Sequence, residues 1–255
     1  MAETIEILGY ILGITLFRYF IIAGTAFLLC YLLLSKMLEN SKIQKRTLKQ
    51  KNIRSEIMHS SQTALVFTAI TFIVLFSPLK EHTLLYEQID EYPYWWIGVS
   101  TLAGLIVHDT YFYWMHRLLH NKRIYKYTHA VHHRSTNPSP WTSYSFHILE
   151  AVAEGVVLVV LVFVIPMHVT SIALFTVIGL AINVYGHLGY EIAPKAFRST
   201  FLFKLLNTSV HHNLHHSRFK GNYGLYFRFW DRLMKTEVPD YEDQYDQLQQ
   251  KRFGS

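Results

Sequence analysis

Five apolar runs constrain the fold of this 255-residue chain more than any other feature. They cover roughly residues 5–34, 64–79, 94–107, 151–165 and 169–184. A helix needs about 20 apolar residues to cross a bilayer, and it pairs all its backbone polar groups internally. We therefore expect an all-α integral membrane bundle of about four transmembrane helices, in which the last two runs form a tight hairpin. Arg18 interrupts the first run, and we expect its side chain to snorkel to an interface.

The charged residues between the runs predict the orientation of this bundle. Residues 35–60 carry seven Lys or Arg against two Glu, whereas residues 79–94 carry one Lys against four acidic residues. The positive-inside rule places the first segment in the cytoplasm and the second outside. The net charge of +6 follows this pattern, so we do not expect a nucleic-acid partner. The chain is predicted to reside in a bacterial inner membrane or the endoplasmic reticulum.

Three histidine motifs follow the apolar runs, and all fall on the predicted cytoplasmic side. The first is His116-Arg-Leu-Leu-His120, the second is His129-Ala-Val-His132-His133, and the third is His211-His212-Asn-Leu-His215-His216. None contains Pro or Gly, so a helix is expected for each. Positions i, i+3 and i+4 share one helix face, so each motif offers two or three imidazoles to one point. The sequence thus predicts a histidine-rich helical cap on the bundle.

Eight imidazoles packed together need a common partner. If all were protonated, the like charges would repel, and burial also disfavours the cation. If they were neutral and unpaired, polar nitrogens would be buried without hydrogen bonds. A metal resolves both problems, because neutral imidazole is a ligand. The number of nitrogens exceeds the need of one ion, which favours two.

The isolated histidines and the single cysteine do not call for further metal sites. Isolated His59, His82 and His168 are interpreted as structural or solvated residues. The single cysteine, Cys30, excludes a disulfide framework and a cysteine-based zinc site. A structural zinc site stays an alternative for the motifs, although such sites usually close at four ligands.

The spacing HxxxH, HxxHH and HxxHH resembles the fatty acid hydroxylase/sterol desaturase superfamily, with a lean toward the sterol desaturase branch. Similar stretches surround the motifs at His108-Asp109, at Asn183-Val-Tyr-Gly-His187 and at Asn222-Tyr-Gly. The resemblance covers roughly residues 95–236, which it identifies as the catalytic domain. Residues 1–94 are then an N-terminal transmembrane region, and residues 237–255 a polar tail at the surface.

The resemblance also implies a set of site residues. Asp109 lies two helical turns before His116, and we expect it to accept the outer N–H of a ligating imidazole, with Glu150 and Asn183 as weaker candidates for such a role. Where some family members have a further histidine, this chain has Glu191, which is either a ligand or a sign of one imidazole fewer. Roles for His108, His147 and His211 are left open. The implied metal ligands are His116, His120, His129, His132, His133, His187, His212, His215 and His216.

The activity implied by the resemblance is O2-dependent hydroxylation or desaturation of a lipid, such as a sterol or a fatty acyl chain. Two iron ions are the implied cofactors, and zinc can replace them in purified protein. No fused haem, flavin or iron–sulfur motif is recognised, so we expect a separate electron donor, either cytochrome b5-like or a ferredoxin. The alternative is a metal-binding or metal-transport protein, but transporters place their ligands near the bilayer midplane.

Overall fold

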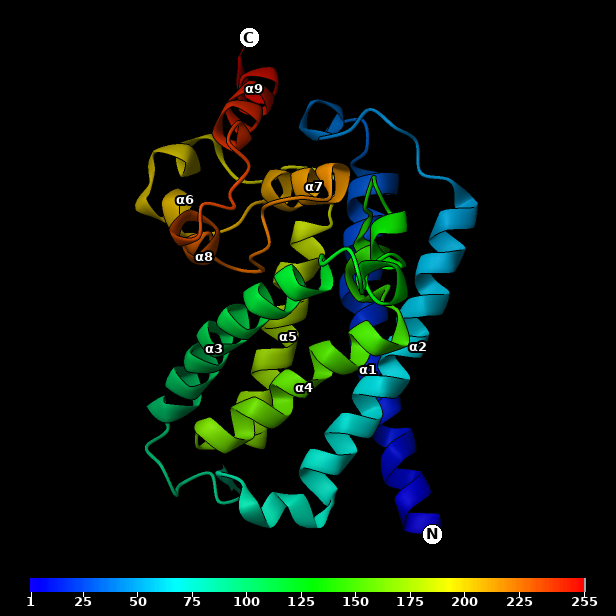
Figure 1. The fold of residues 1–255 in the computed structure, drawn as a ribbon, viewed down its shortest axis with the longest axis vertical. Coiled ribbons are helices and arrows are strands. Elements are labelled where there is room, and N and C mark those ends of the chain that lie inside the picture. Colours follow the sequence, from blue (N-terminus) through cyan, green and yellow to red (C-terminus); the bar gives the residue numbers. More distant parts are fainter. Residues whose placement is uncertain (255) are drawn as a thin grey trace.

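The computed structural model describes residues 1–254, which form a helical bundle and one small sheet (Figure 1). The sheet pairs β1 (Leu85–Tyr86) in parallel with β2 (Met167–His168). The long helices are α1 (Ala2–Phe27), α2 (Gln50–Phe76), α3 (Trp95–Leu119), α4 (Ile148–Val164) and α5 (Val169–Gly186). The shorter helices are α6 (Phe201–Leu205), α7 (Ser209–Arg218), α8 (Phe229–Leu233) and α9 (Tyr241–Phe253). A π-helix (Leu28–Leu33) extends α1, and 3-10 helices cover Glu39–Ser41, Pro78–His82, Tyr125–Tyr127, His132–Arg134, Pro140–Tyr144 and Lys195–Ser199.

The predicted all-α membrane bundle is confirmed. Within residues 1–254, three segments are long and apolar enough to cross a membrane: Ala2–Leu33, Gln50–Phe76 and Val169–Gly186. Helix α4 has 17 residues and is joined to α5 by the short segment 165–168, but α4 packs mainly on α2 and α5 mainly on α3, so the expected tight hairpin is not formed. Helix α3 carries polar residues such as Asp109 along its second half. Large apolar side chains such as Phe17 (69% exposed) and Leu102 (55% exposed) face outward, as contact with lipid requires.

The expectation that the Arg18 side chain snorkels to an interface is wrong. Helix α1 passes through this residue without a break, and Arg18 Nη1 donates to Thr176 Oγ1 on α5 at 2.6 Å. A guanidinium at mid-helix can avoid the cost of exposure to hydrocarbon by turning toward a polar group inside the bundle. Arg18 therefore belongs to the interior of the bundle.

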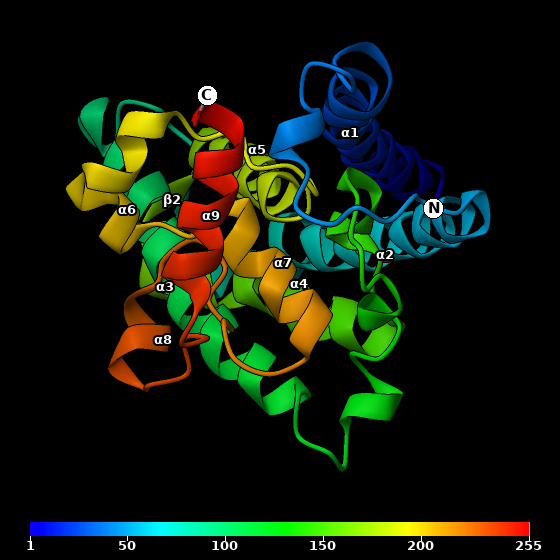
Figure 2. The same cartoon turned by 90° about the horizontal axis from the view of Figure 1, so that it is seen from above.

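The short helices cap one end of the bundle. Figure 1 shows α7 lying across this end, opposite the N-terminus, and Figure 2 shows α7 and α9 over the bundle from above. Thr208 caps the start of α7 by accepting from the backbone N–H of His211 at 3.2 Å. Helix α7 ends where Phe219 adopts a left-handed conformation at φ 62°. The histidine motifs thus meet where α3 ends, α4 begins and α5 ends.

The C-terminal segment differs from the expected surface tail. Helix α9 packs on α7, and Tyr241 and Tyr245 are fully buried in a cluster with Phe203. Arg228, also fully buried, donates to Glu237 at 2.6 Å and to Glu242 at 2.9 Å. Acidic side chains of this segment therefore hold the cap together. The domain boundaries at residues 94 and 236 stay a prediction.

Candidate metal centre

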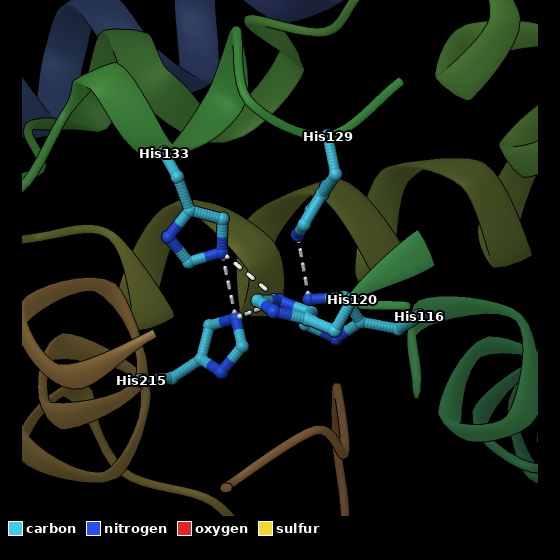
Figure 3. A group of neighbouring side chains, drawn as sticks. All are labelled: His116, His120, His129, His133 and His215. Atoms are coloured by element: carbon cyan, nitrogen blue, oxygen red, sulfur yellow. Dashed lines mark hydrogen bonds between the residues drawn. The ribbon is translucent and has the colours of Figure 1, made fainter. Parts of the chain in front are cut away.

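The structure gathers nine histidines into two neighbouring groups, and in each group one ring nitrogen per residue lies within 4.8 Å of the others. Group A, drawn in Figure 3, contains His116, His120, His129, His133 and His215. Group B contains His132, His187, His212 and His216. Together they are the nine residues named as ligands from the sequence. The groups adjoin, because the ring centroids of His133 and His216 are 4.8 Å apart.

The local backbone explains how two motifs serve both groups. On α7, His212 and His216 are one turn apart and face group B, whereas His215 faces group A. The second motif is not the expected α-helix but a turn followed by the 3-10 helix His132–Arg134. One α-type bond, from the N–H of His133 to the carbonyl of His129 at 3.2 Å, keeps both residues on group A. His132, three residues after His129, faces group B, which is the same division as on α7, where His215 faces the other group from its i, i+4 pair.

Backbone carbonyls determine which nitrogen of three rings carries the proton. A carbonyl oxygen only accepts, so a ring nitrogen facing one must donate. His187 Nδ1 donates to the Asn183 carbonyl at 2.8 Å, and His215 Nδ1 donates to the Gly221 carbonyl at 2.7 Å. His116 Nδ1 donates to the Tyr223 carbonyl at 2.8 Å. The Nε2 atom of each ring therefore presents a lone pair to its group.

The surroundings of His187 Nε2 fit a metal ion better than hydrogen bonding. Three other Nε2 atoms lie around this lone pair, those of His212 at 3.0 Å, His216 at 3.1 Å and His132 at 3.2 Å. One lone pair cannot accept three hydrogen bonds. Imidazoles bound to one divalent ion at about 2.1 Å, at right angles to each other, would have nitrogens about 3.0 Å apart. The spacing in group B thus matches ligands around a common centre.

The ring nitrogens of group A are as closely spaced as those of group B. His215 Nε2 lies 3.0 Å from His133 Nε2 and 3.2 Å from His120 Nε2. His133 Nε2 lies 3.1 Å from His120 Nε2. Figure 3 shows these rings turned toward one another. The Nδ1 atoms of His133, His132 and His216 are buried without a hydrogen-bond partner among residues 1–254. Both donor sets consist of imidazoles, which suit iron and zinc.

Burial keeps these imidazoles neutral and ready to bind. Apart from His120, the nine histidines are at most 4% exposed. Desolvation lowers the pKa of His187 and of His215 to about 4, and the pKa of His120 to about 2. For His216, burial and then the neighbouring imidazoles hold the pKa well below its usual range. A metal would therefore find ligands that need not first release a proton.

The predicted contact of Asp109 with an imidazole is wrong. Its Oδ1 accepts from the backbone N–H groups of Tyr226 at 2.7 Å, Phe227 at 3.1 Å and Leu225 at 3.2 Å. Seven residues of helix separate it from His116 by about 10 Å, which is beyond the reach of an aspartate side chain. Asp109 instead holds the loop that follows α7, which supplies the carbonyl for His116.

Other buried carboxylates position the groups, and sequence reasoning only partly identified them. Glu150 lies 2.5 Å from His129 Nδ1, so the weaker candidate makes the contact that was expected of Asp109. Asp231 accepts from the N–H of Tyr223 at 2.9 Å, close to the carbonyl used by His116. Glu56 on α2 accepts from Ser135 Oγ at 2.6 Å, just after the second motif. The sequence holds no signal for Glu56, because its partner is 79 residues away.

The remaining candidates lie outside both groups. Glu191 accepts from the Tyr185 hydroxyl at 2.7 Å, so group B has one imidazole fewer rather than a carboxylate ligand. His211 packs against Tyr241, with ring centroids 5.0 Å apart, and does not replace His212. His147 caps α4 by accepting from the Leu149 N–H at 3.2 Å. His108 lies within the bundle, 2.9 Å from the Tyr226 hydroxyl.

The fold and the site define a helical membrane protein with two groups of buried imidazoles that could hold metal ions at one end of the bundle. The family model described as fatty acid hydroxylase matches residues 101–236. The chain belongs to this family.

Curated relatives are sterol enzymes. The chain is 31% identical over 179 residues to a Delta(7)-sterol 5(6)-desaturase of Gibberella zeae, covering 70% of this chain and 54% of that enzyme. It is 31% identical over 185 residues to lathosterol oxidase of Rattus norvegicus, covering 71% and 60%. It is 31% identical over 150 residues to methylsterol monooxygenase 1 of the same species, covering 58% and 50%. The chain thus spans half to three-fifths of these relatives' lengths, and no solved structure matches it.

Proposed function

We propose that this protein is an O2-dependent di-iron membrane oxygenase that hydroxylates or desaturates a lipid, with sterols as the favoured class. The observation that carries the proposal is the arrangement of nine buried imidazoles whose ring nitrogens converge on two adjoining points. Lone pairs crowded in this way repel each other unless a cation lies between them. The similarity to a sterol desaturase, a lathosterol oxidase and a methylsterol monooxygenase supports the lipid class.

Each part of the chain has a distinct role in this proposal. Group A and group B would each hold one ion, and bound iron would supply the redox chemistry that activates O2 toward a C–H bond. Carbonyls of Asn183, Gly221 and Tyr223 orient three of the rings and set their tautomers. Glu150 does the same for His129, and Asp109 acts as a positioning residue through the loop after α7. The bundle excludes water from the buried rings.

We place the metal centre on the cytoplasmic face, where a separate electron donor, cytochrome b5-like or a ferredoxin, would dock. Lys45, Arg46 and Lys49 are exposed in the segment that joins α1 to α2. This segment lies at the capped end, because Gln44 Nε2 donates to Asn213 Oδ1 on α7 at 2.9 Å. An acidic donor would be attracted to these basic side chains over the centre.

Metal transport, the alternative function, is disfavoured by the position of the groups. A transporter would need ligands near the bilayer midplane on interrupted helices. The two groups instead lie in the cap, at the ends of α3 and α5 and on α7. This location suits chemistry on a lipid at the membrane surface.

Lipid analysis of cells tests the proposal. Cells expressing the protein with iron and O2 should contain an oxidised lipid that is absent from cells expressing His132→Ala. Anaerobic growth should abolish the same product, while membrane insertion of the variant stays intact. Equal product from the variant, or product formed without O2, would contradict the proposal. An Arg54→Met variant, changed at an exposed position on α2, is the matched control and should make normal product.

A further inference from the structure

A cavity lies inside the bundle beside group B. Its lining includes Asn183, whose carbonyl accepts from His187 Nδ1 at 2.8 Å. It also includes Phe146, whose ring centroid is 5.1 Å from that of His132. Apolar side chains of α2, α4 and α5 form most of the remaining wall. The cavity is therefore mostly apolar, and it reaches Asn183 and Phe146, which contact group B, although none of the nine histidines lines it.

A set of polar side chains interrupts this apolar wall, and we call it the polar belt: Arg18, Thr176, His108, Glu154 and Tyr226. Arg18 Nη1 donates to Thr176 Oγ1, but its Nε is buried and has no partner among residues 1–254. The Tyr226 hydroxyl bonds to His108 Nδ1 at 2.9 Å. His108 Nε2 is buried and likewise has no partner within the described chain. Glu154 is 8% exposed, and its Oε2 is 4.0 Å from His108 Nε2.

Unpaired polar groups in an apolar cavity call for a ligand. Burying such a group without a hydrogen bond is destabilising, and more so if the group is charged. Arg18 also has no carboxylate within ion-pair distance among residues 1–254. Natural membrane proteins rarely keep such a cation inside the bundle unless it has a role there.

The donors and acceptors of the belt discriminate between lipid head groups. The guanidinium of Arg18 can only donate hydrogen bonds, whereas the carboxyl group of Glu154 offers acceptor oxygens. A hydroxyl group both donates and accepts, so it can bond to either residue. A carboxylate would bind Arg18 but would bring a second acidic group beside Glu154 in the same cavity. A pure hydrocarbon would leave Arg18 Nε and His108 Nε2 without a hydrogen bond.

We propose that this cavity binds a lipid bearing a hydroxyl group, with the hydroxyl held by the polar belt and the hydrocarbon extending to group B. The inference rests on the proposed function, because it names the substrate class of the same site. Thr176 precedes His187 by eleven residues of α5, which is about 16 Å of helix. The polar anchor and the metal centre therefore lie at different depths, and the anchor sets which carbon reaches the histidines.

Lipid binding to the purified full-length chain tests this inference without requiring turnover. Tritiated cholesterol is the probe, cholest-5-ene is the same hydrocarbon without the hydroxyl, and stearic acid is the carboxylate competitor. Cholesterol should bind saturably, and cholest-5-ene should compete about tenfold more weakly or worse, because it forms no hydrogen bond. Arg18→Met and Thr176→Val should each reduce the preference for cholesterol, whereas the surface control Arg54→Met should keep it.

Three results would overturn the inference: equal competition by cholest-5-ene, stronger competition by stearic acid, or an undiminished preference in both belt variants. Thr176→Val is nearly isosteric, so it carries the test if Arg18→Met does not fold. Metal content is measured on the same samples. Loss of hydroxyl preference with two metals bound rejects the cavity assignment alone, whereas selective binding without any metal rejects the proposed function alone.

Discussion

Replacing Glu150 with glutamine tests how the chain tunes its metal centre. When His129 binds metal through Nε2, its Nδ1 carries the proton and donates to Glu150 Oε1 at 2.5 Å. Both residues are buried, at 0% exposure for Glu150 and 2% for His129, so water cannot replace the bond. A glutamine at this position would keep the shape of the side chain but offer a weaker acceptor, and its amide nitrogen could favour the wrong tautomer.

The expected loss of metal affinity follows from the one hydrogen bond that changes, between His129 and Glu150. A hydrogen bond to a charged group contributes about 1.5–3 kcal/mol, and about 1.4 kcal/mol corresponds to a factor of ten. Changes at such supporting residues typically weaken metal affinity about 10–100-fold. We therefore expect Glu150→Gln to weaken metal binding at group A, which contains His129, by about one to two orders of magnitude.

Dialysis against graded chelator concentrations, followed by elemental analysis, measures this effect. Glu154→Gln is the matched control, because Glu154 lies one turn further along α4 and outside both histidine groups. The control should retain metal as the wild type does. If Glu150→Gln and Glu154→Gln retain metal equally well, the proposed role of Glu150 in orienting His129 is refuted.

Two further predictions concern the loop after α7 and the acidity of the cluster. Asp109→Ala leaves three backbone amides without their acceptor, at about 1–3 kcal/mol each, so the Tm of this variant should fall by several degrees. Asp109→Asn should lower the Tm less, because its amide oxygen still accepts. If both variants melt at the same temperature as the wild type, the proposed role of Asp109 is contradicted. Because the pKa of His187 and of His215 is lowered to about 4, both rings stay neutral well below their usual pKa, so metal should be retained from pH 7 to pH 6 and released only as the pH falls toward 4. Substantial release between pH 7 and 6, measured after desalting at each pH, would contradict the burial argument.

The sequence predicts those features of this protein that depend on residues close together along the chain. The apolar runs predicted the long helices, and the spacing of the three motifs named eight of the nine histidines that meet in the cap. The ninth, His187, was named from the resemblance to the family. Helical periodicity also explains why His212 and His216 share a group. These features depend on residues within one or two turns of each other, so the chain alone carries them.

The features that the sequence did not predict depend on contacts between distant segments. The second and third motifs divide in the same way, but which group each histidine joins depends on how the segments pack against each other, and residue spacing does not reveal this. Arg18 turns inward because Thr176, 158 residues away, offers an acceptor. The error over Asp109 has a simpler cause: two turns of helix share a face but lie too far apart for contact.

The central claim is that group A and group B each hold one metal ion, and counting ions per chain tests it most directly. Elemental analysis of protein purified from iron-supplemented cells should give two metal ions per chain, as iron or partly as zinc. His187→Ala removes a ligand that only group B uses and should lower the count to one, with the fold of the bundle retained. A wild-type protein that binds no metal, or a variant that still binds two ions as tightly, would contradict the claim.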